Sequence, residues 1–290
     1  MSDVKVVVQG EFYDGYSFKK LIETLATIIN HGNFVFKQDS WHLCELNNNR
    51  SIMVFVAIRT CELINYEYNY DKDELVMGID FENLHRHSKS IGKKNSVIFR
   101  IEENNSSDNL LMVLYSENSS NSAVSPINVT REDNRVPNYI NEHPILVKGG
   151  TWSKICTSIG QLSNILEDTV TILAYEKGFT IEALESSAES LRNIDFGVLS
   201  TSNKLQPNAV TGEYSSVLDA KHPAYITKKD AEAGVIRKLG LPKMVVKLLS
   251  RLDTLCHMGT MKFSFSSEIP MKIKCKIGSY GTFTIYLKSC

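Results

Sequence analysis

The sequence predicts an α+β protein of two similar domains, each with two helices and many short antiparallel strands. Residues 17–46 and 151–184 each show an amphipathic helix pattern followed by two alternating strand patterns. Residues 79–103 and 241–268 are a second related pair, in which a helix runs into a strand. Between the halves, residues 117–144 are polar, contain three prolines and follow no period. The sequence therefore indicates a duplicated chain with a connector in the middle.

From this pattern we predict an N-terminal domain over residues 1–125, a connector over 126–144 and a C-terminal domain over 145–290. Residues 203–240 have no counterpart in the first half, and we interpret them as a hairpin or loop insertion with a short helix. Strands near residues 121–130 and 192–202 are candidate edges for pairing between subunits.

Each of the four predicted helices has one apolar face, because its apolar residues recur at helical spacing. The inward positions include Leu21, Leu25, Ile28, Leu84, Ser88, Ile91, Trp152, Ile155, Ile159, Val245, Leu249 and Leu252. The opposite faces carry Lys20, Thr24, Thr27, Arg86, Lys89, Lys93, Lys154, Thr157, Lys243, Lys247 and Arg251. Glu23 and Asp253 are nearly the only acids on these helices, so all four polar faces are basic or neutral.

Strands are predicted where apolar and polar residues alternate between turn residues. The clearest segments are Ile52–Arg59, Val97–Glu103, Leu110–Tyr115, Val170–Tyr175, Met261–Phe265, Lys272–Ile277 and Phe283–Leu287.

The distribution of charge is more informative than its sum. With 32 Lys+Arg, 33 Asp+Glu and a net charge of −1, the chain lacks the overall basic signature of many nucleic-acid binders. Basic helix faces can be ordinary solvated surface. Four helices with the same bias favour instead a segregated positive face that contacts phosphates without reading sequence. Aromatic residues are not interleaved with these lysines, which argues against stacking of single strands.

The composition of the chain and the motifs that it lacks exclude several classes of protein. The 42% hydrophobic content is too high for a disordered chain, and no apolar run reaches the ~18 residues of a membrane span. Six scattered cysteines are typical of reduced thiols in an intracellular protein. Phosphate-binding loops, nucleophile elbows and paired carboxylates are absent, and His85 and His87 do not share a helix face as metal ligands would. We therefore expect no enzyme activity, no metal and no cofactor.

Several motifs, in this order and spacing, resemble the sliding clamps of the proliferating cell nuclear antigen (PCNA) type over nearly the whole chain. They are Lys19–Leu25 with its paired lysines, Trp41–Leu46, Arg50–Arg59, Met77–Asp80, Asn109–Tyr115, Val136-Pro137, Ile269-Pro270 and Tyr286-Leu287. The resemblance implies the DNA-clamp fold, with helices packed on curved antiparallel sheets. Such clamps assemble as a ring, usually of three two-domain subunits, around double-stranded DNA.

The resemblance also implies a function. The chain would be a DNA polymerase processivity factor, a homotrimer that a clamp loader ATPase opens and that tethers polymerase and repair enzymes. These clients would bind through PIP-box-like peptides in a front-face pocket. The implied location is the nucleus, or a viral replication site in the cytoplasm, and no membrane is involved.

The family's DNA-contacting positions fall on Lys19, Lys20, Arg86, Lys89 and Lys154, and approximately on Lys247 and Arg251. We add Lys93 and Lys243 from the basic faces. Two usually basic positions are neutral here, Ala26 and Thr157, which implies a weaker grip on DNA. The peptide pocket would comprise Leu46, Arg50, Met53, Val136, Pro137, Pro270 and Tyr286, although each alone could be an ordinary core residue.

Departures from the family pattern point to a divergent member, viral or protist. The connector is less hydrophobic than usual, with Arg131–Arg135 in its middle, and the 203–240 insertion is unusual. An alternative is therefore a subunit of a heterotrimeric checkpoint clamp, or a viral replication or transcription accessory factor of the same fold. A DNA-modifying enzyme is a third and weaker hypothesis.

Overall fold

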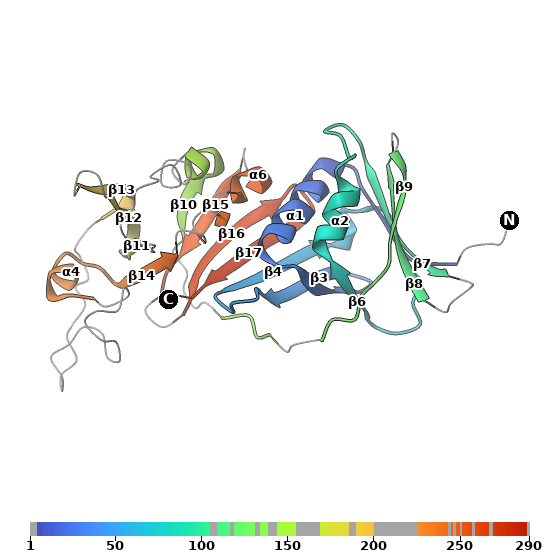
Figure 1. Cartoon of the computed structure of the whole chain (residues 1–290), viewed down its shortest axis with the longest axis horizontal. Coiled ribbons are helices and arrows are strands. Elements are labelled where there is room, and N and C mark those ends of the chain that lie inside the picture. Colours follow the sequence, from blue (N-terminus) through green and yellow to red (C-terminus); the bar gives the residue numbers. More distant parts are fainter. Residues whose placement is uncertain are drawn as a thin grey trace. The chain divides into compact units, whose positions relative to one another are not determined.

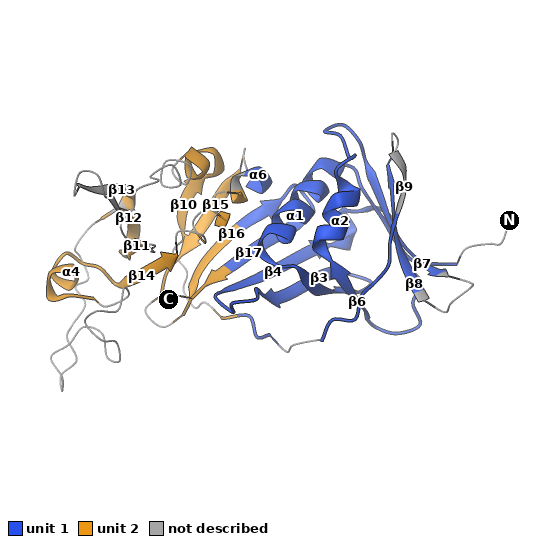
Figure 2. Cartoon of the chain, viewed as in Figure 1, with its two compact units in different colours: residues 1–136, 254–256, 275–285 blue, residues 137–253, 257–274, 286–290 orange. Residues whose placement is uncertain are grey.

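A computed structural model of the chain describes residues 5–104, 109–116, 119–130, 134–138, 144–154, 169–185, 190–199, 226–242, 245, 248–249, 251–256, 259–266 and 269–288. The chain forms two compact units (Figures 1 and 2). Unit 1 comprises residues 1–136, 254–256 and 275–285, and unit 2 comprises 137–253, 257–274 and 286–290. Because residues near the end of the chain belong to unit 1, the units do not coincide with the predicted domains, whose boundaries stay a prediction.

Unit 1 has two helices, each started by an aspartate. In α1 (Gly15–Ile28), the Asp14 carboxylate accepts the backbone N–H of Ser17 at 3.2 Å. In α2 (Phe81–Ser88), the Asp80 carboxylate accepts the N–H of Asn83 at 3.0 Å. These bonds satisfy N–H groups that have no partner inside the helix. The predicted apolar face of α1 is buried in the structure.

Two antiparallel sheets complete unit 1. The first has the order β5-β1-β7-β8-β9, from β5 (Ile64–Tyr68), β1 (Val6–Phe12), β7 (Val97–Asn104), β8 (Asn109–Ser116) and β9 (Ser119–Val124). The second consists of five neighbouring strands of an eight-stranded sheet, in the order β17-β4-β3-β2-β6, from β17 (Gly281–Leu287), β4 (Ile52–Arg59), β3 (Ser40–Leu46), β2 (His31–Phe36) and β6 (Leu75–Asp80). The last two residues of β17 belong to unit 2. A short 3₁₀ helix, η1 (Thr60–Glu62), links β4 to β5.

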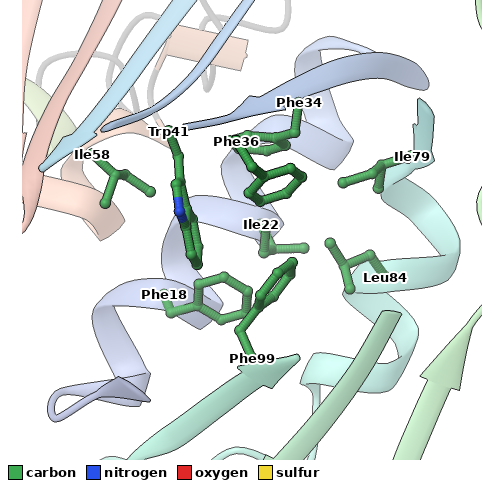
Figure 3. A pocket seen from close by; sticks show the side chains of 9 residues that line it. All are labelled: Phe18, Ile22, Phe34, Phe36, Trp41, Ile58, Ile79, Leu84 and Phe99. Atoms are coloured by element: carbon green, nitrogen blue, oxygen red, sulfur yellow. The ribbon is translucent and has the colours of Figure 1, made fainter. Parts of the chain in front are cut away.

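The core of unit 1 is an aromatic cluster between these sheets and helices (Figure 3). The Trp41 ring lies 5.1 Å from Phe36 and 4.9 Å from Phe99, centroid to centroid. The Trp41 indole N–H donates to the Tyr66 hydroxyl at 3.2 Å. Only about 10 Å³ is left unfilled among these side chains, all of them apolar. A space of that size and polarity stays dry, so the interior is packed core and offers no ligand pocket.

Unit 2 is built from short strands and helix turns. Strands β10 (Ile145–Lys148), β15 (Thr260–Ser264) and β16 (Met271–Ile277) are neighbours in that order. A four-stranded sheet has the order β13-β12-β11-β14, from β13 (Ser190–Val198), β12 (Lys177–Glu185), β11 (Thr169–Ala174) and β14 (Arg237–Pro242). Its described helical segments are α4 (Lys228–Glu232), α6 (Leu252–Cys256), whose last three residues belong to unit 1, residues 149–154, and the helical positions 245 and 248–249. The buried Trp152 N–H donates to the Leu249 carbonyl at 2.9 Å.

The structure confirms the seven predicted strands to within one or two residues. It also confirms a short helix in the 203–240 segment, which is α4. Two predictions on helix faces are wrong. Thr24 is buried, and its hydroxyl is satisfied by donating to the Lys20 carbonyl within α1. The helix α2 ends at Ser88 with Lys89 as its C-cap residue, still in the helical conformation, so Lys93 is not on a helical stripe with Arg86.

The rest of the 203–240 segment before residue 226 lies outside the described residues, as do Ile155, Thr157, Ile159, Lys243 and Lys247. Within the described ranges, no helix has the length and apolarity needed to cross a membrane. The same ranges contain no group of side chains suited to hold a metal ion. Among the cysteines that the structure describes, Cys44, Cys61, Cys256 and Cys275 are free thiols.

Candidate nucleic-acid interface

Lys19 joins the two helices of unit 1. Its ammonium donates to the Lys89 carbonyl at 2.6 Å and to the Ile91 carbonyl at 2.9 Å. These carbonyls follow the C-terminus of α2, where backbone acceptors lack helical partners and a cation is favoured. Burial, followed by the charge of Lys20, lowers the pKa of Lys19. Lys19 therefore acts mainly in holding the segment after α2 against α1.

Lys20 is on the same helix but in a different environment. Its ammonium lies 2.7 Å from the Glu23 carboxylate and 5.3 Å from the centroid of the Tyr16 ring. Burial opposes the charged form, but the hydrogen bond and charge of Glu23 outweigh burial and raise the pKa of Lys20. Lys20 thus keeps its charge, and Glu23 neutralises part of it.

The remaining predicted cations of unit 1 are exposed. Arg86 lies in the last turn of α2, and Lys89 and Lys93 lie in the segment that follows it. The Lys93 ammonium is 5.7 Å from the Tyr16 ring centroid, so this ring has cations from both α1 and the later segment beside it. The structure therefore brings together Lys20, Lys93 and Tyr16, a contact that helical periodicity alone did not predict.

His85 lies close to this cluster. Burial lowers the pKa of His85, Glu23 opposes that shift, and Lys89, Lys19 and Lys20 add to it. Of the predicted cations in unit 2, Lys154 and Arg251 are exposed.

The predicted peptide-pocket residues of unit 1 lie around the β3–β4 hairpin. Leu46 and Met53 are directly opposite each other across these strands. Arg50 is in the connecting loop with φ of 54°, and the loop is held by Asn47, whose side-chain oxygen accepts the N–H groups of Ser51 and Ile52 at 2.9 Å each. The sequence reasoning missed Asn47, although an Asn in a tight turn is a common signal.

The start and the middle of the connector are attached to unit 1 by hydrogen bonds. The Ile127 N–H donates to the Gly78 carbonyl at 3.0 Å, next to β6. Farther along, the Asn134 side-chain amide donates to the Cys44 carbonyl at 3.2 Å, and the Cys44 thiol donates to the Asn134 carbonyl at 3.4 Å. Burial, with a smaller contribution from Glu45, raises the pKa of Cys44 to about 11, so the thiol stays protonated and can donate.

Val136 follows these contacts and is 39% exposed, as a docking position requires. Pro137, Pro270 and Tyr286 belong to unit 2, where the two prolines are half-buried and Tyr286 is buried. The pocket as a whole stays a prediction.

Two strands occupy the edges expected for assembly. β9 is the last strand of the five-stranded sheet in unit 1, and β13 is the last strand of the four-stranded sheet in unit 2. Both edges were predicted from the sequence, near 121–130 and 192–202.

Comparisons with known proteins agree with this architecture. The sequence model of the proliferating cell nuclear antigen N-terminal domain matches residues 7–134. A crystal structure of the proliferating cellular nuclear antigen of Entamoeba histolytica has a TM-score of 0.71 and 14% identity, covering 99% of this chain and 100% of that one. The PCNA2–PCNA3 complex of Sulfolobus tokodaii gives a TM-score of 0.65 and 15% identity, with 97% and 98% covered. No curated protein matches in sequence.

The two kinds of match are complementary. The family model covers the helices α1 and α2 with the strands around them, whereas the structural likeness extends through both units. PCNA-family clamps are not enzymes, which agrees with the expectation from the motifs. Residues 7–134 therefore match the PCNA N-terminal domain model, and the chain as a whole has the DNA-clamp fold of the PCNA-type sliding clamps.

Proposed function

We propose that the protein is a DNA polymerase processivity factor that encircles duplex DNA as a homotrimeric ring. The observation that carries the proposal is the clamp fold together with exposed cations at the end of α2 and just beyond it. Mobile lysine and arginine side chains attract phosphates without fixing a base register. A ring that holds DNA in this way can slide, and release requires that the ring open.

Strand pairing between subunits would close the ring. The edge strands β9 and β13 each expose unpaired backbone groups along one side. A head-to-tail contact of one subunit's β9 with the next subunit's β13 is heterologous, and such contacts form rings when the rotation closes. PCNA-family clamps form oligomeric rings, which supports this assembly.

Clients would dock where the connector passes β3 and β6. Their peptides would place apolar anchors against Leu46, Met53 and Val136, with Arg50 at the rim. The polymerase, repair enzymes and a clamp loader ATPase are the expected partners, at the nucleus or a viral replication site. The hydrogen bonds that attach the connector to β6 and β3 support a preformed docking surface.

Charge reversal tests the inner surface. The double variant Arg86→Glu/Lys89→Glu should lose most retention on closed circular DNA, and its binding should depend less steeply on salt. Lys72→Glu, which changes an exposed lysine in an acidic loop, is the matched control. Unchanged retention by the double variant, with the ring still assembled, would reject the proposed DNA surface.

A second candidate is a subunit of a mixed ring. One of the similar structures is itself a complex of two different PCNA chains. In that case the purified chain would stay monomeric alone and form a ring only with a partner chain.

A further inference from the structure

An open hollow lies at the start of α1, apart from the predicted peptide pocket. It has a volume of about 580 Å³ and is lined by Glu11, Tyr13, Asp14, Lys93, Lys94 and Ser96. That volume is within the ~300–1,000 Å³ typical of small-ligand clefts. The lining combines an aromatic ring with paired cations, a combination that suits a nucleotide better than an apolar ligand.

The two segments that line the hollow are fixed to each other. The Gly15 N–H donates to the Asn95 carbonyl at 3.0 Å, and the Asn95 side-chain oxygen accepts the Gly92 N–H at 2.9 Å. A Cβ at Gly15 would lie 2.6 Å from a Val97 methyl, so only glycine permits this approach. The turn with Lys93 and Lys94 is therefore held beside Tyr13 before any ligand arrives.

The aromatic side chains are placed for contact with a ligand and with cations. Tyr13 is 76% exposed, which is unusual for a large ring in a folded domain. Its neighbour Tyr16 holds the Lys20 and Lys93 ammonium groups at 5.3 and 5.7 Å from its ring. Positive charge is thus concentrated at Tyr16, three residues from the exposed ring of Tyr13.

The hollow also contains two carboxylates, those of Glu11 and Asp14. Asp14 already accepts both the N–H and the hydroxyl of Ser17, at 3.2 and 2.5 Å. Glu11 can accept from the exocyclic amino group of cytosine, adenine or guanine. Bases in a duplex are stacked and their edges paired, so only an unpaired base could both stack on Tyr13 and reach Glu11.

We infer that this hollow binds unpaired nucleotides of single-stranded nucleic acid, with a base stacked on Tyr13 and the adjoining phosphates on Lys93 and Lys94. The sequence pattern pointed away from such a site, because no aromatic residue is interleaved with the helix lysines. The fold supplies the ring from before α1 and the cations from after α2. This activity goes beyond the encirclement of duplex DNA and does not require it.

Fluorescence anisotropy with a labelled single strand of about ten cytidines tests the inference. The full-length protein should bind this oligomer, and Tyr13→Ala should weaken binding about tenfold, because base stacking contributes ~1–3 kcal/mol. Tyr13→Phe should keep most of the affinity, since it retains the ring. Lys93→Ala/Lys94→Ala should weaken binding and flatten its dependence on salt. Tyr70→Ala, in the segment between β5 and β6, is the control.

The inference would be overturned if Tyr13→Ala bound the oligomer as tightly as the unaltered protein does. It would also be overturned if the protein bound a blunt duplex of the same length as tightly as the single strand, and if Tyr13→Ala did not change that duplex binding. An RNA oligomer of the same sequence shows whether the site prefers DNA or RNA. A loss of affinity in Tyr13→Ala for either oligomer supports the site. A short linear strand cannot be trapped by a ring. Loss of retention on circular DNA with intact oligomer binding would therefore count against the proposed clamp function alone.

Discussion

At the scale of single residues, neighbouring lysines on one helix have different tasks. Lys19 donates to two backbone carbonyls beyond α2, whereas Lys20 pairs with Glu23 and lies beside Tyr16. Both residues match the family's paired lysines, so the sequence alone does not separate them. Their different contacts in the structure distinguish their roles. A hydrogen bond from a charged donor contributes more than a neutral one when solvent is partly excluded.

Lys19→Met should lower the free energy of unfolding by about 1 kcal/mol, because two carbonyls lose a charged donor at a partly exposed site. Urea denaturation measures this change. Lys94→Met, an exposed lysine in the nearby turn, should change it by less than about 0.5 kcal/mol. Equal effects of the two substitutions would show that the Lys19 contacts do not stabilise the fold.

His85 should make stability depend on pH. Its pKa is lowered from the ordinary 6.5, so the unfolded chain takes up this proton at a higher pH than the folded chain does. The contribution of His85 to stability is therefore present above pH 6.5 and is lost as the pH falls toward the lower folded pKa. Urea midpoints across this window should fall less steeply in His85→Gln than in the unaltered protein. His87→Gln, two residues away, is the control, and an unchanged slope in His85→Gln would contradict the assignment.

At the scale of elements, the sequence predicted most of the fold because each pattern is local. Helix faces such as Leu21 and Leu25 and strands such as Ile52–Arg59 follow from periodicity. The end of α2 at Ser88 could not be predicted in the same way, because the basic residues continue past it at helical spacing. Contacts between distant segments, such as Tyr16 with Lys93, also leave no local pattern.

The connector is an element whose position depends on one glycine. A Cβ at Gly78 would lie 2.2 Å from the Ile127 carbonyl oxygen, too close for any side chain. Gly78→Ala should therefore detach the start of the connector and speed proteolysis within residues 125–136 several-fold. Gly32→Ala, at a site in β2 where the nearest atom belongs to a flexible glutamate side chain, is the comparison. Equal cleavage rates for Gly78→Ala and the unaltered protein would mean that this attachment does not hold the connector.

The edge strands allow a similar test. Ala123→Pro in β9 should prevent pairing between subunits and yield smaller assemblies, because proline cannot donate a strand hydrogen bond. Glu67→Pro in β5, the opposite edge of the same sheet, should leave the assembly intact. Sedimentation velocity measures the size of the assembly that each variant forms. A loss of assembly with Glu67→Pro but not with Ala123→Pro would contradict the prediction, because it would place the subunit contact at β5 and not at β9.

At the scale of the whole molecule, the proposed function depends on assembly more than on any catalytic group. Weak contacts from residues such as Arg86 and Lys89 would suffice in a closed ring, because its topology would prevent release of the DNA. It was the resemblance to the PCNA-type clamps that allowed ring assembly to be predicted from the sequence. Periodicity alone indicated a duplicated α+β chain and did not indicate how many copies assemble.

The central claim is that this chain closes into a ring by itself, and its solution mass tests that claim most directly. Light scattering on a sizing column at micromolar concentration should give about three times the chain mass of 32.7 kDa. A single species at 32.7 kDa that persists as the concentration rises would contradict the homotrimeric clamp.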